Sequence, residues 1–152
     1  MAAALDYRTA FELAPIGMML SRERLVTDVN QQALAIFGAR REQLVGHSFE
    51  LLYPTPDEFE RTGARIVASL DKQGRYADER IMKRLGGATA GELFWCHVSG
   101  RALDPAAPHA AGIWAFDDLS SRRVLEVDFT AREREIAALL IEGLTSKLIG
   151  KR

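Results

Sequence analysis

The stretch ELFWCHVSGRAL, residues 92–103, gives the first indication of the fold. Its large side chains alternate, with Phe94 and Val98 on one face of an extended chain and Trp95 and His97 on the other. An alternation with a period of two residues over this length predicts a β-strand. The pattern leaves open which of the two faces points inward, because an N-terminal helix could cover either.

Working outward from this stretch, two further strands are predicted on its two sides. Residues 75–85 alternate apolar and polar side chains, and residues 112–116 form a short β-prone run. Turns rich in glycine or proline separate the three segments, so they form a meander. Near the N-terminus, residues 16–20 and 25–29 predict a hairpin.

The segments between the hairpin and the meander predict helices. Asn30 is a favourable N-cap, and Gly38 ends the helix that follows it. A short helical turn is expected over 41–45, and a longer helix over 56–70. Since strands and helices do not alternate along the chain, the expected class is α+β, with a five-stranded antiparallel sheet and short helices on one face.

Composition limits the function classes. The 152 residues are 47% hydrophobic and 27% charged, with a net charge of −1, which suits a soluble globular chain. No apolar run approaches the ~20 residues that a membrane span requires, and the N-terminus lacks the pattern of a secretory signal. Cys96 is the single cysteine, so no internal disulfide can form. A cytoplasmic location without a membrane partner is therefore predicted.

Several short motifs resemble those of PAS domains. They are FELAPIG at 11–17, LVGHS at 44–48, FWCHVSG at 94–100 and FDDLS at 116–120. Their order and spacing carry the resemblance more than any one motif does. It implies a PAS-like fold over residues 5–119, including an N-terminal amphipathic helix. It also implies that the acidic pair at the end of the domain anchors the next segment by a salt bridge or a helix cap.

A second resemblance begins after a linker at 120–128. FTAREREI at 129–136 opens with a capping box, and with EGLTSK at 142–147 it is similar to the start of a LuxR-type helix-turn-helix. Residues 129–152 are therefore expected to be the truncated start of a DNA-binding domain, a partial C-terminal helical segment without its recognition helix. In this domain the candidate DNA-contacting residues are Thr145, Ser146 and Lys147.

Together the two resemblances imply the signal-sensing domain of a DNA-binding transcriptional regulator. A small effector or a partner would shift the sensor between two arrangements, and the linker would carry the change to the helix-turn-helix. DNA would be bound by the intact parent protein and not by this fragment. A homodimer is expected, through the amphipathic helix at 5–13 packing on an exposed face of the sheet.

In PAS domains the usual ligand site is the space between the helices and the sheet, and this resemblance supplies the candidate pocket. An ordinary filled core, in a module that dimerises without a ligand, is the alternative interpretation. The candidate lining residues are Met18, Phe37, Phe49, Tyr53, Phe59, Ile66, Trp95, His97 and Ile113.

A haem or flavin sensor is a further alternative, but neither cofactor is expected. Haem-binding PAS domains usually carry their histidine on the long helix, and 56–70 has none; His47 lies in a predicted loop. The Asn-Cys-Arg-Phe motif of flavin-binding photoreceptors is missing, and Cys96 is interpreted as a buried structural thiol.

No catalytic constellation occurs in the sequence. A Gly-x-Ser-x-Gly elbow, a phosphate-binding loop and a His-Glu-x-x-His motif are all missing. The three histidines lie far apart, without the spacing of metal ligands. Neither catalytic residues nor metal ligands are therefore predicted, and the chain is not expected to be an enzyme.

Overall fold

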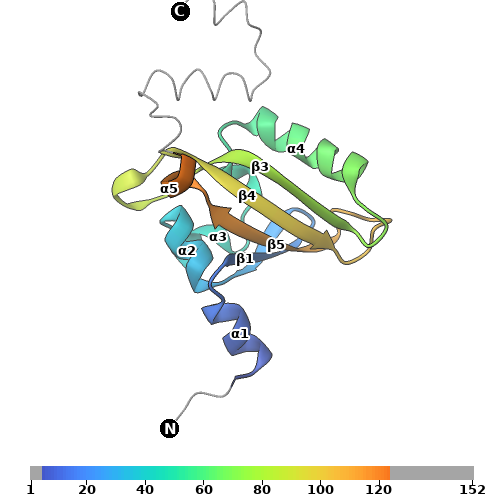
Figure 1. The fold of residues 1–152 in the computed structure, drawn as a ribbon, viewed down its shortest axis with the longest axis horizontal. Coiled ribbons are helices and arrows are strands. Elements are labelled where there is room, and N and C mark those ends of the chain that lie inside the picture. Colours follow the sequence, from blue (N-terminus) through green and yellow to red (C-terminus); the bar gives the residue numbers. More distant parts are fainter. Residues whose placement is uncertain (1–4, 124–152) are drawn as a thin grey trace, which may run out of the picture.

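The computed structural model describes residues 5–123. Within this part of the chain, a hairpin, a group of helices and three further strands follow one another, and all five strands form a single sheet (Figure 1). The elements are α1 (Tyr7–Leu13), β1 (Gly17–Arg22), β2 (Leu25–Val29), α2 (Gln31–Phe37), α3 (Arg41–Leu44), η1 (Phe49–Leu52), α4 (Pro56–Ser69), β3 (Arg75–Lys83), η2 (Gly87–Thr89), β4 (Leu93–Ala102), β5 (Ala111–Asp118) and α5 (Ser120–Arg123).

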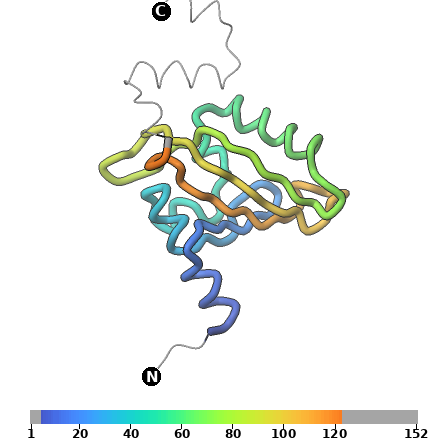
Figure 2. Tube along the Cα trace, viewed as in Figure 1, coloured from blue at the N-terminus to red at the C-terminus, as the bar shows by residue number. Residues whose placement is uncertain are grey.

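The sheet has five strands in the order β2-β1-β5-β4-β3, and every neighbouring pair is antiparallel. The first strand, β1, lies beside the last, β5, with Met18 opposite Ala115 (Figure 2). The predicted α+β class, the hairpin and the three-stranded meander are confirmed. The order in which the hairpin joins the meander was not among the expectations from sequence.

The hairpin between β1 and β2 has a two-residue turn, Glu23-Arg24. Both residues have positive φ angles, 53° and 64°. This is the backbone of the turns that match the twist of antiparallel strands, although glycine or asparagine is usual there. The turn thus holds Arg24 in an uncommon backbone conformation close to α4, where its guanidinium reaches the Phe59 carbonyl.

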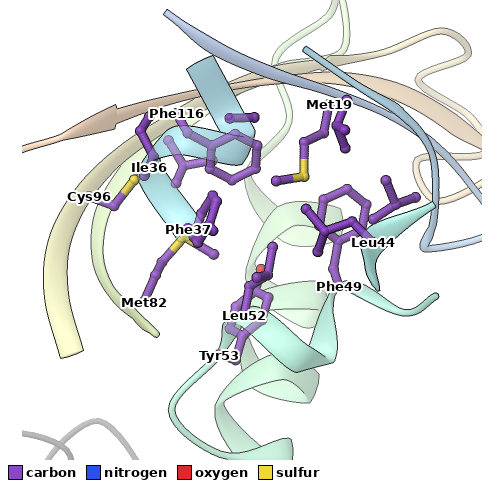
Figure 3. Close-up of a cluster of buried hydrophobic side chains, with 14 of the residues drawn as sticks. Met19, Ile36, Phe37, Leu44, Phe49, Leu52, Tyr53, Met82, Cys96 and Phe116 are labelled. Carbon is purple, nitrogen blue, oxygen red and sulfur yellow. The ribbon is translucent and has the colours of Figure 1, made fainter. Parts of the chain in front are cut away.

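One face of the sheet packs against the helices and forms the core. Phe37 at the end of α2 makes edge-to-face contacts with Phe94 and Phe116, with ring centroids 5.7 and 5.5 Å apart. Figure 3 shows Met19, Phe37 and Phe116 meeting in this layer. Phe94, Cys96 and Val98 are buried in this layer, so this face of β4 points inward, which the alternation in the sequence alone left open.

Asn30 joins three elements. Its Oδ1 accepts hydrogen bonds from the Ala33 amide (3.0 Å), which caps α2, and from the Met18 amide of β1 (2.9 Å). Its Nδ2 donates to the carbonyls of Phe11 and Ile16, at 2.9 and 3.0 Å. The predicted N-cap is confirmed, and the left-handed Gly38 ends the helix as expected.

The two ends of the described chain differ in their packing. Helix α1 projects from the sheet and has no buried residue (Figure 1). At the other end, α5 begins at Ser120, where the linker was predicted. The rest of that linker, and the predicted helix-turn-helix start with Thr145, Ser146 and Lys147, lie outside the described residues.

Candidate functional site

A cavity of about 40 Å³ lies between α4 and the inner face of the sheet. A space of this volume has room for about three or four water molecules. The wall is mostly apolar, with polar groups from several elements. The lining residues are Ser21, Arg24, Phe49, Tyr53, Phe59, Ile66, Arg80, Val98, Pro108, His109, Trp114 and Phe116.

Four of the candidate residues from the sequence line this cavity. Phe49 comes from η1, Tyr53 follows it, and Phe59 and Ile66 come from α4. Helical spacing places the last two on the face of α4 that is turned toward the sheet. A fifth candidate, Phe37, is fully buried in the core but is not part of the cavity wall.

The other four candidates do not line the cavity, which corrects their predicted placement. Met18, Trp95, His97 and Ile113 each alternate along a strand with an inward-facing neighbour, so they point to the opposite face. Ile113 is 42% exposed and lines a separate shallow groove. When a strand has large side chains on both faces, the sequence does not show which face is buried. For this reason the sequence could not separate the residues that line the cavity from those on the opposite face.

At one end of the cavity, Arg24 packs against α4. Its guanidinium lies 3.7 Å from the centre of the Phe59 ring, and Nη2 donates to the Phe59 carbonyl at 2.8 Å. Nη1 lies 3.6 Å from the carboxylate of Glu60. A side chain at Gly63 would place its Cβ 2.5 Å from Arg24 Nη2, so glycine at this position leaves the space that the guanidinium occupies.

Arg80 of β3 and Tyr53 form the buried polar wall. Arg80 is 6% exposed; its Nη1 donates to the Tyr53 hydroxyl and its Nε to Asp78 Oδ1, both at 2.7 Å. Burial raises the pKa of Tyr53, which keeps its hydroxyl protonated at neutral pH. Burial alone would lower the pKa of Arg80, but Tyr53 and Asp78 outweigh it, so this pKa is raised and the side chain stays charged.

The remaining polar groups lie on the loop before β5 and on the first strand. Burial, and then the charge of Arg24, lower the pKa of His109, so its imidazole is neutral at neutral pH. Trp114 donates from Nε1 to Ser21 Oγ at 3.1 Å, which joins β5 to β1 across the cavity wall. The cavity therefore combines fixed donors with an apolar surface.

Sequence reasoning missed most of the polar lining residues. Arg80 lies in a segment that reads as an ordinary half-exposed strand, and Arg24 lies in a predicted polar turn. Arginines in such positions are usually solvated, so their residue type carries no signal of burial. The alternation along β3 was visible, but only the position of the strand at the sheet edge under η1 shows that Arg80 faces the core.

The junction between the sheet and α5 has the anchoring contacts that the PAS resemblance implied. Asp118 accepts the Ser120 amide at 2.8 Å, which caps α5, and forms a salt bridge with Arg84 at 2.9 Å. The Arg84 guanidinium also lies 3.9 Å from the Phe94 ring centre and donates to the carbonyl of Ile36. This junction links the core, the end of α2 and the beginning of α5.

Cys96 is fully buried on the inner face of β4. Burial raises the pKa of its thiol to about 12, so the reactive thiolate is scarce at neutral pH. We expect iodoacetamide to alkylate Cys96 at least about 100-fold more slowly in the folded chain than in urea. Mass spectrometry over time measures both rates, and equal rates would contradict the buried placement.

Residues 5–123 contain no group of three histidine, cysteine or acidic side chains placed to hold a metal ion. Among the helices of this described part, none has the length and apolar character needed to cross a bilayer. His47, considered as a haem ligand, is exposed between α3 and η1 and lies outside the cavity wall.

The family model described as PAS domain matches residues 15–121, so the chain belongs to the PAS domain family. This is a family of sensory domains, which agrees with the small cavity between the sheet and its helices. The match extends from just before β1 to the start of α5.

Two solved PAS domains illustrate the similarity. One is the PAS domain of a LuxR-family transcriptional regulator from Burkholderia thailandensis, solved in complex with ethanol. It is 59% identical, with a TM-score of 0.71, and the match covers 76% of this chain and 99% of that one. A PAS domain from Colwellia psychrerythraea is 16% identical with a TM-score of 0.64, covering 76% and 95% of the two chains, and shows the fold alone.

A curated relative is the sensor protein TdiS of Thauera aromatica. It is 28% identical over 137 residues, which are 90% of this chain but only 24% of TdiS. The chain thus corresponds to about a quarter of that protein. The comparisons place this sequence among the sensory domains of signalling proteins.

Proposed function

We propose that this chain is the sensor of a transcriptional regulator and binds a small effector in the cavity beneath α4. The observation that carries the proposal is the cavity itself, which has room for a few atoms beside buried polar and apolar side chains. The similar LuxR-family PAS domain in complex with ethanol supports it, because ethanol has the size that this cavity suits.

The output of the sensor is a change at the junction with α5. The Arg84–Asp118 salt bridge and the cap on Ser120 tie this segment to the core. A ligand that favours one arrangement of the core therefore changes the populations at the junction. The similarity of residues 129–136 and 142–147 to a LuxR-type helix-turn-helix, and the LuxR-family neighbour, support DNA as the partner of the intact parent protein.

The proposed regulator acts as a homodimer in the cytoplasm without a catalytic step. Helix α1 supports the dimer, because Leu5, Tyr7 and Leu13 at this end of the chain are 89%, 95% and 62% exposed. A module that dimerises through α1 and takes no ligand is the second candidate function, and it rests on the same exposed side chains. An absorbance spectrum tests the haem or flavin alternative, since either cofactor gives visible bands.

A substitution that fills the cavity tests ligand binding. In Ile66→Phe the larger ring occupies the space beside Phe59, and we expect the affinity for propan-1-ol to fall by at least about tenfold. NMR titration of the full chain measures it. Val67→Phe is the matched control, because Val67 is 53% exposed on the same helix. If Ile66→Phe binds like the wild type, the cavity is not the binding site.

A further inference from the structure

The cavity wall contains a buried cation with unused hydrogen-bonding capacity. Arg80 donates from Nε to Asp78 and from Nη1 to Tyr53, but its Nη2 has no acceptor among residues 5–123, although it is shielded from solvent. A buried donor without a partner loses its hydrogen bonds to water with nothing in exchange, and this cost is larger when the donor is charged. Arg80 lines the cavity, so after a small shift of the shielded guanidinium an acceptor in the cavity would reach Nη2 and remove this cost.

Tyr53 presents a second donor next to the first. Its hydroxyl oxygen accepts the bond from Arg80 Nη1, so its own hydrogen remains for another partner. Tyr53 is buried and lines the same cavity, and its raised pKa keeps that hydrogen in place at neutral pH. Arg80 and Tyr53 together can donate to the two oxygens of one carboxylate.

The charges around the cavity favour an anion. Two arginines, Arg24 and Arg80, are among the lining residues, and no aspartate or glutamate is. Asp78 and Glu60 offset part of this charge from outside the wall. Charge–charge interactions are stronger in a site of low dielectric, so an anionic group gains more here than it would in water.

The volume of the cavity and the apolar part of its wall limit the rest of the ligand. The space takes about three or four separate water-sized groups, and because bonded atoms lie closer together than separate waters, it suits a molecule of about four or five atoms beyond hydrogen. Away from Arg80, the wall is formed by Phe59, Ile66, Val98 and other apolar side chains, which suit a short hydrocarbon chain. A long fatty acid or a dicarboxylate does not match these dimensions.

We propose that the effector is a short-chain monocarboxylic acid, bound as its carboxylate. One oxygen accepts from Arg80 Nη2 and the other from the Tyr53 hydroxyl, while the alkyl chain packs on Ile66 and Phe59. This inference rests on the proposed function, since it names the chemical class of the ligand for the same cavity.

The test compares propionate with propan-1-ol, which have the same three-carbon length. NMR titrations of the full chain at neutral pH, with sodium chloride balancing the ionic strength, give both affinities. Because a hydrogen bond to a charged group contributes about 1.5–3 kcal/mol, we expect propionate to bind at least about tenfold more tightly. Octanoate, which exceeds the cavity, is expected not to bind.

A conservative substitution tests the contact itself. Tyr53→Phe keeps the ring and removes the hydroxyl, and we expect it to weaken propionate about five- to tenfold and propan-1-ol by clearly less, because a hydrogen bond to a charged acceptor contributes more than one to a neutral acceptor. Tyr7→Phe, at an exposed tyrosine, is the matched control. Arg80→Gln removes the cation, but Arg80 is also buried against Asp78, so the folded state of that variant is checked by circular dichroism.

The outcomes separate the two proposals. If propan-1-ol binds as tightly as propionate, or Tyr53→Phe weakens both equally, the carboxylate assignment is wrong and the cavity remains a ligand site. If neither compound produces shifts at the cavity residues, both the assignment and the proposed function fail. Selective binding of propionate that depends on the Tyr53 hydroxyl supports both.

Discussion

Asn30→Ala is expected to lower the free energy of unfolding by about 3 kcal/mol or more. The side chain is completely buried and has four hydrogen bonds, two accepted from backbone amides and two donated to backbone carbonyls. Alanine removes the cap of α2 and leaves the Met18 amide and the carbonyls of Phe11 and Ile16 without this partner. Urea unfolding monitored by circular dichroism measures the change.

Asn30→Asp separates the role of a helix cap from that of a connector. Aspartate caps a helix as well as asparagine does, so a residue that only capped α2 would tolerate the change. A carboxylate, however, cannot donate to the carbonyls of Phe11 and Ile16 and would repel them. We therefore expect Asn30→Asp to destabilise the chain too, whereas Gln31→Ala, at an exposed neighbour, changes little. Wild-type stability in Asn30→Asp would contradict the connecting role.

Gly100→Ala should destabilise the domain by about 2 kcal/mol, although alanine is normally the better residue in a strand. A Cβ on Gly100 would lie 2.2 Å from Cε3 of Trp114, so the indole must move. Its Nε1 is bonded to Ser21, and that bond would be strained or lost. Thermal unfolding gives the stability, and a weaker affinity for propan-1-ol is expected because Trp114 lines the cavity.

The clash is tested by a double-mutant cycle. Trp114→Leu removes the ring that meets the new methyl group, so adding Gly100→Ala to this background should cost much less than it does in the wild type. Ser99→Ala, one residue earlier on the same strand, serves as a control outside the cavity wall. Additive effects in the cycle, or a Gly100→Ala variant more stable than the wild type, would overturn the explanation.

Much of the fold could be predicted from local patterns. Period-two alternation located β2, β3 and β4, short apolar or β-prone runs located β1 and β5, and Asn30 and Gly38 marked the ends of α2, because these signals depend only on neighbours in sequence. The hydrogen bonds from Asn30 to Phe11 and Ile16 were not predictable, since they require the end of α1 and the beginning of β1 to meet in space. Capping chemistry identifies the residue but not its distant partners.

The cavity was predicted less completely for a related reason. The apolar residues on α4 and around η1 could be assigned to the helix side, because helical spacing defines which face is apolar. On a strand, alternate residues point toward the cavity side and the opposite side of the sheet. Because β4 has large side chains on both faces, its sequence does not show which set faces the cavity. The polar part of the wall depends on arginines that the tertiary fold buries, and local sequence does not show this.

The pairing of β1 with β5 has a consequence for how the chain acquires its structure. These strands are neighbours in the sheet, but Met18 and its partner Ala115 are separated by almost the whole of the domain. During synthesis, the hairpin must wait for the last strand before the middle of the sheet can close. Since contacts between distant residues slow folding, we expect a ribosome-bound chain that ends before residue 111 to remain sensitive to protease, and protection to begin once β5 has emerged.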